Sequence, residues 1–526
     1  MKKIGYILVA GLLISACSME PQLTSSYSEK IAWSSESNAQ MYVNDFYSLL
    51  GSDYYNGAVS DDCCSDIMKS NDPTSDENYF LYGTIKVSQD SNPLFNNWSW
   101  GHSWALDVCR FIDNMNKFGT GLSQEFRDYL EAQVRWFRAH VYFEMAKRFG
   151  ASVVIWRELP PMGTKDYERC TPEQCWDFIE EDLDFAIAHL PVTNDAGLLT
   201  KGAAYGLKAR AMLHAGRYDK ALAAAEEIEK LGIYDLEPDY AKLFQYRRVQ
   251  GVSKESIAEF GFSYPSMSYT FDKFYCPPGD GGYAQVSPTE NLVAMYQMAD
   301  GRDFSWNDPA MAAAPYEGRE KRFYASILYD GCTWKGRTLD MTPGSPDGIV
   351  SGGISTTTGY YMRKLCDPSQ TEGFIESDLT FYYMRYAEVL LIRAEALAQL
   401  GRVNEALPFL NQVRTRAGFT TPLTASSKSE FMKLLQHECA VEFAFEGHRF
   451  WDLRRWGIIK QTMNNTKRKG VKPVEEGGVR TYMVFSADNK TIKYDDKYAR
   501  FPIPLSEIQR NEAMEQFDEW KLFINS

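Results

Sequence analysis

Histidine is scarce in this sequence, and dense runs of basic residues are nearly absent. The 526 residues include six His, and 56 Lys and Arg stand against 70 Asp and Glu, which gives a formal net charge of −14. A surface that binds nucleic acid neutralises phosphates with clustered Lys and Arg. The one such cluster is the triplet at 467–469, which Gly470 follows and which we interpret as a solvated loop. The composition therefore argues against a nucleic-acid partner.

The sequence also lacks the motifs of common enzyme and metal sites. His437 and Glu438 are not followed by the second His of a zinc-protease helix, and Cys170 and Cys175 are too far apart for a C-x₂-C ligand pair. The glycines of 279–282 are not followed by Lys and Ser or Thr, and no nucleophile elbow occurs. We therefore predict no catalytic residue, no metal site and no cofactor, and leave open whether calcium binds.

One segment near the C-terminus places Glu442, Glu446 and His448 close together, as an acid–base site would. Several Phe and Trp residues surround these charges, and charges among so many rings are normally paired. We therefore predict a helix that ends at Gly447 and holds structural Arg–Glu pairs.

No run of apolar residues reaches the ~18 that a membrane-spanning helix needs. The N-terminus carries a shorter pattern, in which two Lys precede an apolar stretch that ends at Ile14-Ser15-Ala16-Cys17. This pattern is typical of a bacterial lipoprotein signal peptide. We predict a signal peptide over 1–16, lipidation of Cys17, and a lipid-anchored tether over 17–28. The alternative is an ordinary secretory peptide beside a chance Cys.

The sequence contains ten Cys, of which nine remain if Cys17 carries the lipid. An odd number leaves at least one thiol unpaired in an oxidising compartment. The spacing of these cysteines assigns no disulfide.

Helical periodicity covers much of the remaining chain. Leu130, Val134, Phe137, Val141 and Met145 recur at spacings of three and four residues, which predicts a long helix. The next helix begins with a T-x-x-Q capping box and a proline at its first position, over 171–174.

Two segments, 207–222 and 392–407, repeat each other, with Gly216 aligned on Gly401. Each contains small residues, a glycine turn and a second helix that opens with Ala-Leu, which is typical of a tetratricopeptide hairpin. Together with two earlier hairpins, they predict about four such hairpins, mainly within about 105–231 and 383–417.

Helical periodicity fades in two stretches, about 52–101 and 251–380, where Gly, Pro and aromatic residues accumulate. Long loop-rich insertions between helices are uncommon unless they are functional. We therefore predict that these stretches form the ligand-facing surface of a single body over 29–526.

The most specific resemblance lies at 385–419 and 438–457, which read RYAEVLLIRAEALAQLGRVNEALPFLNQVRTRAGF and ECAVEFAFEGHRFWDLRRWG. These segments are similar to the signature of the SusD/RagB outer-membrane nutrient-binding lipoproteins of Bacteroidetes. Further matches extend over nearly the whole chain: QVRWFRAHVYFEMAKRFG, REKRFYASILYDGCTW, TGYYMRKLCDP and FPIPLSEIQRN.

The resemblance implies a mainly α fold with four tetratricopeptide-like hairpins and a large irregular loop-rich half that carries the ligand site. It also implies a lipoprotein on the cell surface, held in the outer membrane, that binds an oligo- or polysaccharide and delivers it to a SusC-like TonB-dependent transporter. Two alternatives stay open: an oligopeptide-binding lipoprotein of the same transport system, and a glycoside hydrolase, which would need two carboxylates across the scissile bond.

Candidate ligand contacts follow from the chemistry of a sugar, which presents flat C–H faces and a rim of hydroxyl groups. Aromatic rings cover the faces, and Asn, Asp or Arg side chains satisfy the hydroxyls. The candidates in the loop-rich stretches are Asp66, Asn97, Trp98, Trp100, Tyr275, Tyr283, Trp306 and Trp334.

Overall fold

The computed structural model describes residues 29–51, 59–88, 97–247, 251–264, 266–350, 353–370 and 377–524. The predicted signal peptide, the lipidation site at Cys17 and the tether lie outside these residues. Within them, no helix combines the length and the apolar character that crossing a membrane requires.

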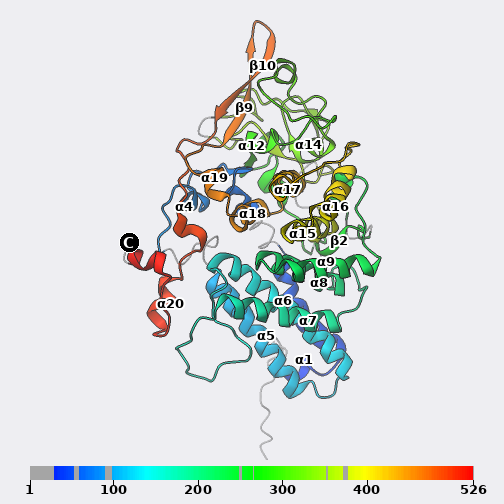
Figure 1. Ribbon diagram of the computed structural model, residues 1–526, viewed down its shortest axis with the longest axis vertical. Helices are drawn as coiled ribbons and strands as arrows, with labels where there is room; N and C mark the ends of the chain where they lie inside the picture. Colours follow the sequence, from blue (N-terminus) through cyan, green and yellow to red (C-terminus); the bar gives the residue numbers. More distant parts are fainter. Residues whose placement is uncertain are drawn as a thin grey trace, which may run out of the picture.

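A stack of helices fills the lower half of the molecule and continues to its centre (Figure 1). Each helix packs on the next one in the order α5 (Trp98–Phe118), α6 (Gln124–Phe149), α7 (Pro172–His189), α8 (Lys201–His214), α9 (Tyr218–Leu231), α15 (Tyr386–Gln399) and α16 (Val403–Arg416). The residues between α9 and α15 form the loop-rich half. The chain therefore leaves the stack after α9 and returns to it at α15.

The remaining helices flank this stack or lie among the loops. They are α1 (Glu29–Ala32), α2 (Glu36–Asn44), η1 (Asp45–Leu50), α4 (Glu77–Leu81), α10 (Tyr240–Leu243), α11 (Phe271–Tyr275), η3 (Pro278–Asp280), α12 (Glu290–Val293), α13 (Pro309–Ala313), α14 (Lys321–Ser326), α17 (Lys428–Glu442), α18 (Arg449–Arg455), α19 (Ile459–Met463), η4 (Asp496–Ala499), α20 (Leu505–Arg510) and η5 (Asp518–Phe523).

Local sequence signals explain where the main helices begin and end. Thr171 and Gln174 form the predicted capping box at the start of α7. Gly216 (φ 71°) and Gly401 (φ 81°) both adopt the left-handed conformation in the turns of α8–α9 and α15–α16. Glycine reaches this conformation without steric cost, so the same turn recurs in both copies of the repeat. The predicted mainly α fold with helical hairpins is confirmed.

The helix α6 lies at the centre of the stack. Its predicted apolar stripe is buried, and Trp136 on a second face of the helix is buried as well, at 0% exposed. Gly101 of α5 lies so close to it that an added Cβ would approach the sulfur of Met145 to 2.5 Å. A side chain at this position would therefore require the Met145 side chain to shift.

The strands are short and form two-stranded antiparallel sheets in the described residues. The pairs are β1 (Met68–Ser70) with β3 (Val286–Pro288), β2 (Ser256–Gly261) with β8 (Thr380–Arg385), β4 (Ile327–Leu328) with β7 (Tyr361–Met362), β5 (Thr333–Trp334) with β6 (Arg337–Thr338), and β9 (Lys469–Glu476) with β10 (Val479–Ser486). A second hydrophobic core, separate from that of the helical stack, supports these sheets and the loops around them.

The β9–β10 hairpin projects from the loop-rich end, at the top of Figure 1. Arg468, immediately before β9, is 3% exposed, and its guanidinium donates to the carboxylate of Asp488 at 2.8 Å. The same side chain donates to the carbonyl oxygens of Cys63 and Met68. The predicted solvated loop at 467–469 is therefore wrong for Arg468, because an acid 20 residues further along the chain neutralises its charge.

Candidate functional site

The eight predicted ligand contacts do not form one cluster. Trp98 is the first residue of α5 and is 1% exposed. Its ring packs edge-on against Phe149, with the centroids 5.1 Å apart. Trp100 is partly buried against the core of the helical stack, and Asn97 precedes the helix as its N-cap residue. These three residues therefore belong to the helical stack, and Trp98 presents no ring face to solvent.

Asp66 and Tyr275 are also buried. Both carboxylate oxygens of Asp66 accept hydrogen bonds from Arg449, at 2.9 and 3.0 Å. Tyr275 is 5% exposed, and its ring lies 4.7 Å from that of Phe271 in the second core. Both residues thus have partners within the protein, and ligand contact by either one stays a prediction.

Tyr283 and Trp306 are more accessible. Tyr283 is 43% exposed, and the ammonium of Lys273 lies 5.8 Å from its ring centroid. Trp306 is half-buried, and its Nε1 donates to Oε1 of Glu290 at 2.6 Å. The other oxygen of Glu290 accepts from Tyr360. Burial raises the pKa of Glu290 to about 7, although these two hydrogen bonds oppose the shift.

Trp334 lines a cavity of about 240 Å³, which we call the Trp334 cavity. Its wall is formed by side chains and backbone from four separate segments: Ala241, Phe244, Gln245, Lys321, Tyr324, Ala325, Trp334, Arg363, Lys364, Leu365, Cys366 and Pro368. Three of these residues are aromatic and three are basic, and the lining contains no Asp or Glu. The cavity therefore combines ring surfaces with positive charge.

The fold brings these side chains together over long distances in the chain. Lys321 and Tyr324 lie on α14, Trp334 ends β5, and Arg363 follows β7. The guanidinium carbon of Arg363 lies 5.5 Å from the ring centroid of Trp334. Trp334 is 2% exposed, and its Nε1 has no hydrogen-bond partner among the described residues. An indole N–H is a donor that a buried site normally satisfies.

The basic residues of the Trp334 cavity differ in their partners. Lys364 is buried and its Nζ lies 2.6 Å from Oε1 of Glu446. Burial lowers the pKa of Lys364 to about 8, and the charge of Glu446 opposes this shift. Neither Lys321 nor Arg363 makes an ion pair with any carboxylate in the described part of the chain. Their two charges are thus available to a ligand.

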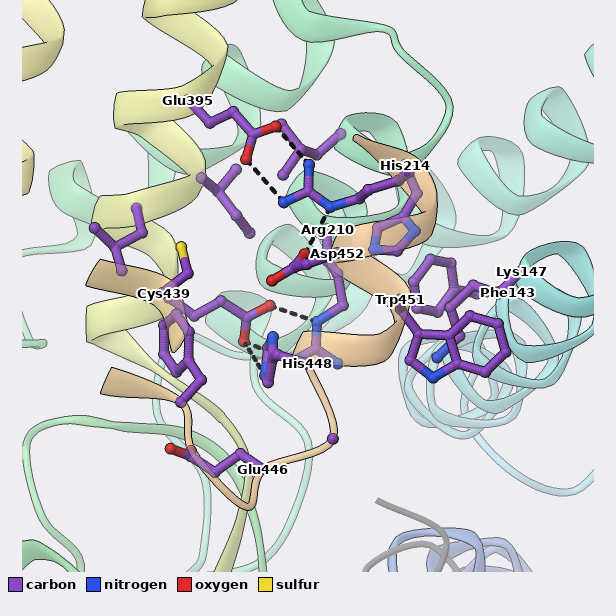
Figure 2. Close-up of a pocket in the computed structure, with 17 residues that line it drawn as sticks. Phe143, Lys147, Arg210, His214, Glu395, Cys439, Glu446, His448, Trp451 and Asp452 are labelled. Carbon is purple, nitrogen blue, oxygen red and sulfur yellow. Dashed lines mark hydrogen bonds and ion pairs between the residues drawn. The ribbon is translucent and has the colours of Figure 1, made fainter. Parts of the chain in front are cut away.

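A second cavity, of about 50 Å³, lies between α8, α15 and α18 (Figure 2). Arg210 donates to both oxygens of Glu388 at 2.6 Å, and Arg455 pairs with Glu395 and Asp452. Burial lowers the pKa of His448, which faces this network. Such a volume accommodates only one or a few water molecules, and the charges around it are already paired.

The Glu442 and Glu446 carboxylates are structural, as predicted. Glu442 accepts from Arg385 at 2.6 Å and from Arg322 at 3.0 Å, and Arg416 also donates to it. Glu446 accepts from Arg385 and Lys364. The helix ends earlier than predicted, because α17 stops at Glu442 and a separate turn carries the chain into α18.

A third hollow, of about 530 Å³, lies beside α17 and α19. Its lining includes Met295, Met432 and His437, but no Phe, Tyr or Trp ring. The Trp334 cavity differs from this hollow in having three aromatic residues in its lining.

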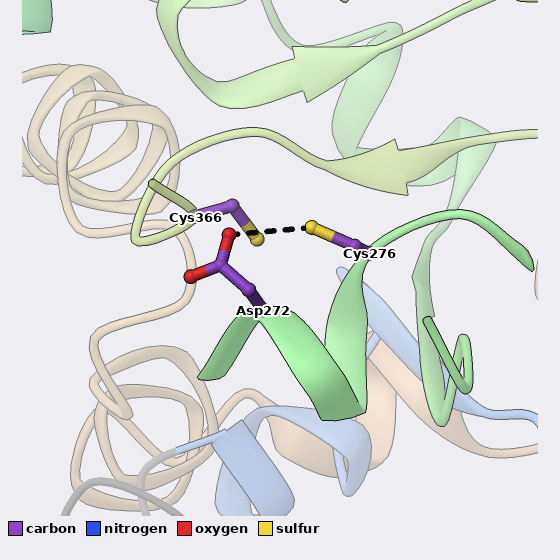
Figure 3. A group of neighbouring side chains, drawn as sticks. All are labelled: Asp272, Cys276 and Cys366. Carbon is purple, nitrogen blue, oxygen red and sulfur yellow. Dashed lines mark hydrogen bonds between the residues drawn. The ribbon is translucent and has the colours of Figure 1, made fainter. Parts of the chain in front are cut away.

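Asp272, Cys276 and Cys366 could offer three ligand atoms to a metal, since these atoms all lie within 4.8 Å of one another (Figure 3). The ammonium of Lys335, however, lies 3.6 Å from Oδ1 of Asp272. A cation beside the carboxylate already compensates its charge and would repel a metal ion. The nine cysteines that the structure describes are all free thiols.

The helical stack defines a helical-repeat protein. Its irregular, loop-rich half contains the Trp334 cavity. The model of the SusD family matches residues 249–520, and a model described as "Starch-binding associating with outer membrane" matches residues 20–213. The chain belongs to the SusD family. The resemblance predicted from 385–419 and 438–457 is thereby confirmed.

Relatives match along most of the chain. A SusD-like protein of Formosa agariphila is 23% identical over 556 residues, which cover 98% of each protein. The starch-binding protein SusD of Bacteroides thetaiotaomicron is 28% identical over 198 residues, 37% of this chain and 31% of that protein. The crystal structure of a SusD-like protein from Bacteroides fragilis has a TM-score of 0.79 at 29% identity, over 92% of this chain and 97% of that chain.

Trp334 is among the ligand contacts predicted from the sequence, whereas its neighbours in the cavity are not, and ligand contact by Trp334 stays a prediction. Lys321, Tyr324 and Arg363 all lie in segments that resemble the family, at 319–334 and 358–368. Nothing in their local composition distinguishes them from other surface residues. Only the packing of α14 and of the segment after β7 shows that they line one cavity.

Proposed function

We propose that this protein is a cell-surface lipoprotein that binds glycan and passes it to a SusC-like TonB-dependent transporter. The observation that carries the proposal is the match of residues 20–213 to a model described as starch-binding and associating with outer membrane. The half-buried ring of Tyr324 in the Trp334 cavity supports it, because rings are the side chains that cover the faces of a sugar.

The proposal makes the protein a binding protein and not an enzyme. The carboxylates that the sequence places near one another, Glu442 and Glu446, are held by Arg and Lys side chains in ion pairs. A glycosidase instead needs one carboxylic acid that keeps its proton and a second carboxylate across the scissile bond. The helical stack would face the transporter, while the loop-rich half would meet the glycan.

Affinity electrophoresis of the detergent-solubilised full-length protein tests this function. Native gels containing starch, laminarin, xylan, mannan, pectin, alginate or chondroitin sulfate should show retarded migration in at least one case. Binding without release of reducing ends supports a capture protein, and release of product would support the hydrolase. If no polysaccharide retards the protein while a mixture of oligopeptides gives heat in titration calorimetry, the peptide alternative replaces the proposal.

The transporter partnership has its own test. An affinity tag on this protein should co-purify a TonB-dependent barrel from outer membranes solubilised in mild detergent. Recovery of the protein without any barrel, at a detergent concentration that preserves other outer-membrane complexes, would contradict this part of the proposal.

A further inference from the structure

We propose that the Trp334 cavity binds the acidic group of an anionic glycan, either the carboxylate of a uronic acid or the sulfate of a sulfated sugar. This inference rests on the proposed glycan-binding function and narrows it to a class of glycan. The chemistry shared by both sources is a negatively charged oxygen cluster on a pyranose ring.

The charge of the Trp334 cavity is opposite to the net charge of the chain. The chain as a whole carries 14 more acidic than basic residues, yet the lining of the Trp334 cavity contains Lys321, Arg363 and Lys364 and no acid. A cavity lined by positive charge raises the local concentration of anions, even when the net charge of the protein is negative. The cavity therefore attracts anions within an otherwise acidic protein.

Two of these cations have no carboxylate partner among the described residues. Of the three, Lys364 is paired with Glu446, whereas Lys321 and Arg363 make no ion pair with a described residue. Most Arg side chains elsewhere in the structure, such as Arg385 and Arg322, bind carboxylates. Arg363 is half-buried in the hollow and loses hydration that an anionic ligand can replace, whereas Lys321 is exposed at its edge.

The side chains of Arg363 and Lys321 are hydrogen-bond donors that suit an acidic group. A guanidinium presents parallel N–H groups that match the two oxygens of a carboxylate or two oxygens of a sulfate. Arg363 lies near the ring of Trp334, which holds the guanidinium beside an apolar surface. Lys321, at the start of α14, adds a second positive charge on the same cavity.

The Trp334 cavity is small, and its wall is partly apolar. A volume of about 240 Å³ is smaller than the ~300–1,000 Å³ of sites for drug-sized ligands, so it suits one sugar residue and not an oligosaccharide. Tyr324 is half-buried and supplies ring surface to the wall, whereas Phe244 and Trp334 are 5% and 2% exposed and lie mostly behind it. A small inorganic anion would leave the Tyr324 ring without a contact, whereas an acidic pyranose can contact this ring and the cations together.

Matched pairs of polysaccharides test the inference. The detergent-solubilised full-length protein is run in native gels that contain polygalacturonate or its methyl ester, and chondroitin sulfate or desulfated chondroitin, beside neutral starch, laminarin, xylan and mannan. We expect the acidic member of one pair to bind at least tenfold more tightly than its partner. The first pair identifies a carboxylate and the second a sulfate.

The outcomes separate this inference from the proposed function. Binding of neutral glycans only, or equal binding of both members of each pair, would overturn the anionic preference and leave glycan binding intact. Failure to bind any of the glycans would overturn the proposed function itself.

Two variants then locate the charge. Arg363→Gln and Lys321→Gln should each weaken binding of the acidic glycan by about tenfold or more, the scale of one lost charge-assisted hydrogen bond. Arg302→Gln is the matched control, because Arg302 lies in the same half, is 65% exposed and pairs only with nearby Asp300 in the described residues. The affinity of Arg302→Gln for the acidic glycan should match that of the unmodified protein.

Lys321 is exposed, so its substitution keeps the test informative even if Arg363→Gln reduces folding. Circular dichroism melts confirm that each variant is folded before binding is compared. Unchanged affinity of a folded Lys321→Gln and a folded Arg363→Gln would show that the acidic group does not bind in the Trp334 cavity.

Discussion

The indole Nε1 of Trp306 donates a hydrogen bond of 2.6 Å to Oε1 of Glu290, a carboxyl group that is 2% exposed. Tyr360 donates to the other oxygen, also at 2.6 Å. Glu290 therefore joins a half-buried ring of the loop-rich half to the second core. Because its charge has no ion-pair partner in the described residues, the protonation of this single group affects the stability of the region.

We expect Glu290 to make stability depend on pH. Burial raises its pKa from 4.5 to about 7, so the native carboxyl holds its proton more tightly than the unfolded chain does. Its contribution to stability is complete below about pH 4.5 and is lost as the pH rises through about 7. As the pH rises from 5 to 8, the free energy of unfolding of the unmodified protein should therefore fall by about 2–3 kcal/mol relative to that of Glu290→Gln.

Thermal melts or urea titrations at both pH values measure this gain. Glu317→Gln serves as the control, because Glu317 is exposed on the same half of the molecule and should show no pH-dependent difference. Parallel pH profiles for Glu290→Gln and the unmodified protein would refute the role of this carboxyl.

Glu442 should behave in the opposite way. Although burial alone would raise its pKa, the guanidinium groups of Arg416, Arg385 and Arg322 hold that pKa well below the usual range. The stability it contributes is present above about pH 4.5 and falls only in stronger acid. At pH 7, Glu442→Gln should cost about 3–5 kcal/mol, because it leaves buried guanidinium groups without a countercharge.

Chemical denaturation provides the measurement for Glu442→Gln. Its control is Glu405→Gln, since Glu405 pairs with Arg402 on the surface, where the two side chains are 58% and 45% exposed. That change should alter stability by less than about 1 kcal/mol. A loss at Glu442 no larger than the loss at Glu405 would show that this network does not stabilise the fold.

Cys17 gives the prediction that concerns anchoring. If Cys17 carries the lipid, then Cys17→Ser should remove labelling by an alkyne fatty acid. It should also release the protein from the membrane fraction, because stable anchoring needs two acyl chains or an equivalent second signal. Cys170→Ser changes another cysteine that is not fully buried and should keep both the label and the membrane location. Equal labelling of both variants would place the lipid elsewhere or nowhere.

The helical stack was predictable from the sequence because its signals are local. The stripe of α6, the capping box of α7 and the paired glycines Gly216 and Gly401 each depend on residues within a few turns. The β9–β10 hairpin also had a local signal, since Gly477 and Gly478 separate two strand-like runs.

Buried charges and the cavity were not predictable in this way. Arg468 looks solvated until Asp488, Cys63 and Met68 are seen around it, the last two some 400 residues away. Trp334 and Phe244 likewise come together only through the packing of the loop-rich half. Periodicity reports which face of an element is apolar, but not which distant side chain satisfies a polar group.

The predicted ring contacts can be separated by their exposure, which gives the last prediction. Trp98 is 1% exposed in the core of the stack, so Trp98→Ala should lower stability by about 3–5 kcal/mol through the cavity it creates. Tyr283 is 43% exposed, so Tyr283→Ala should leave stability within about 0.5 kcal/mol of the unmodified protein. Denaturant titrations measure both changes.

Glycan affinity then distinguishes structural rings from binding rings. Once the folded fraction is corrected for, Trp98→Phe should bind glycan as the unmodified protein does, because the smaller ring keeps the core apolar and never meets solvent. Tyr283→Ala should bind more weakly if its exposed ring stacks on a sugar residue, by roughly five- to tenfold for a contact of about 1 kcal/mol. Normal affinity in Tyr283→Ala would remove Tyr283 from the predicted ligand contacts.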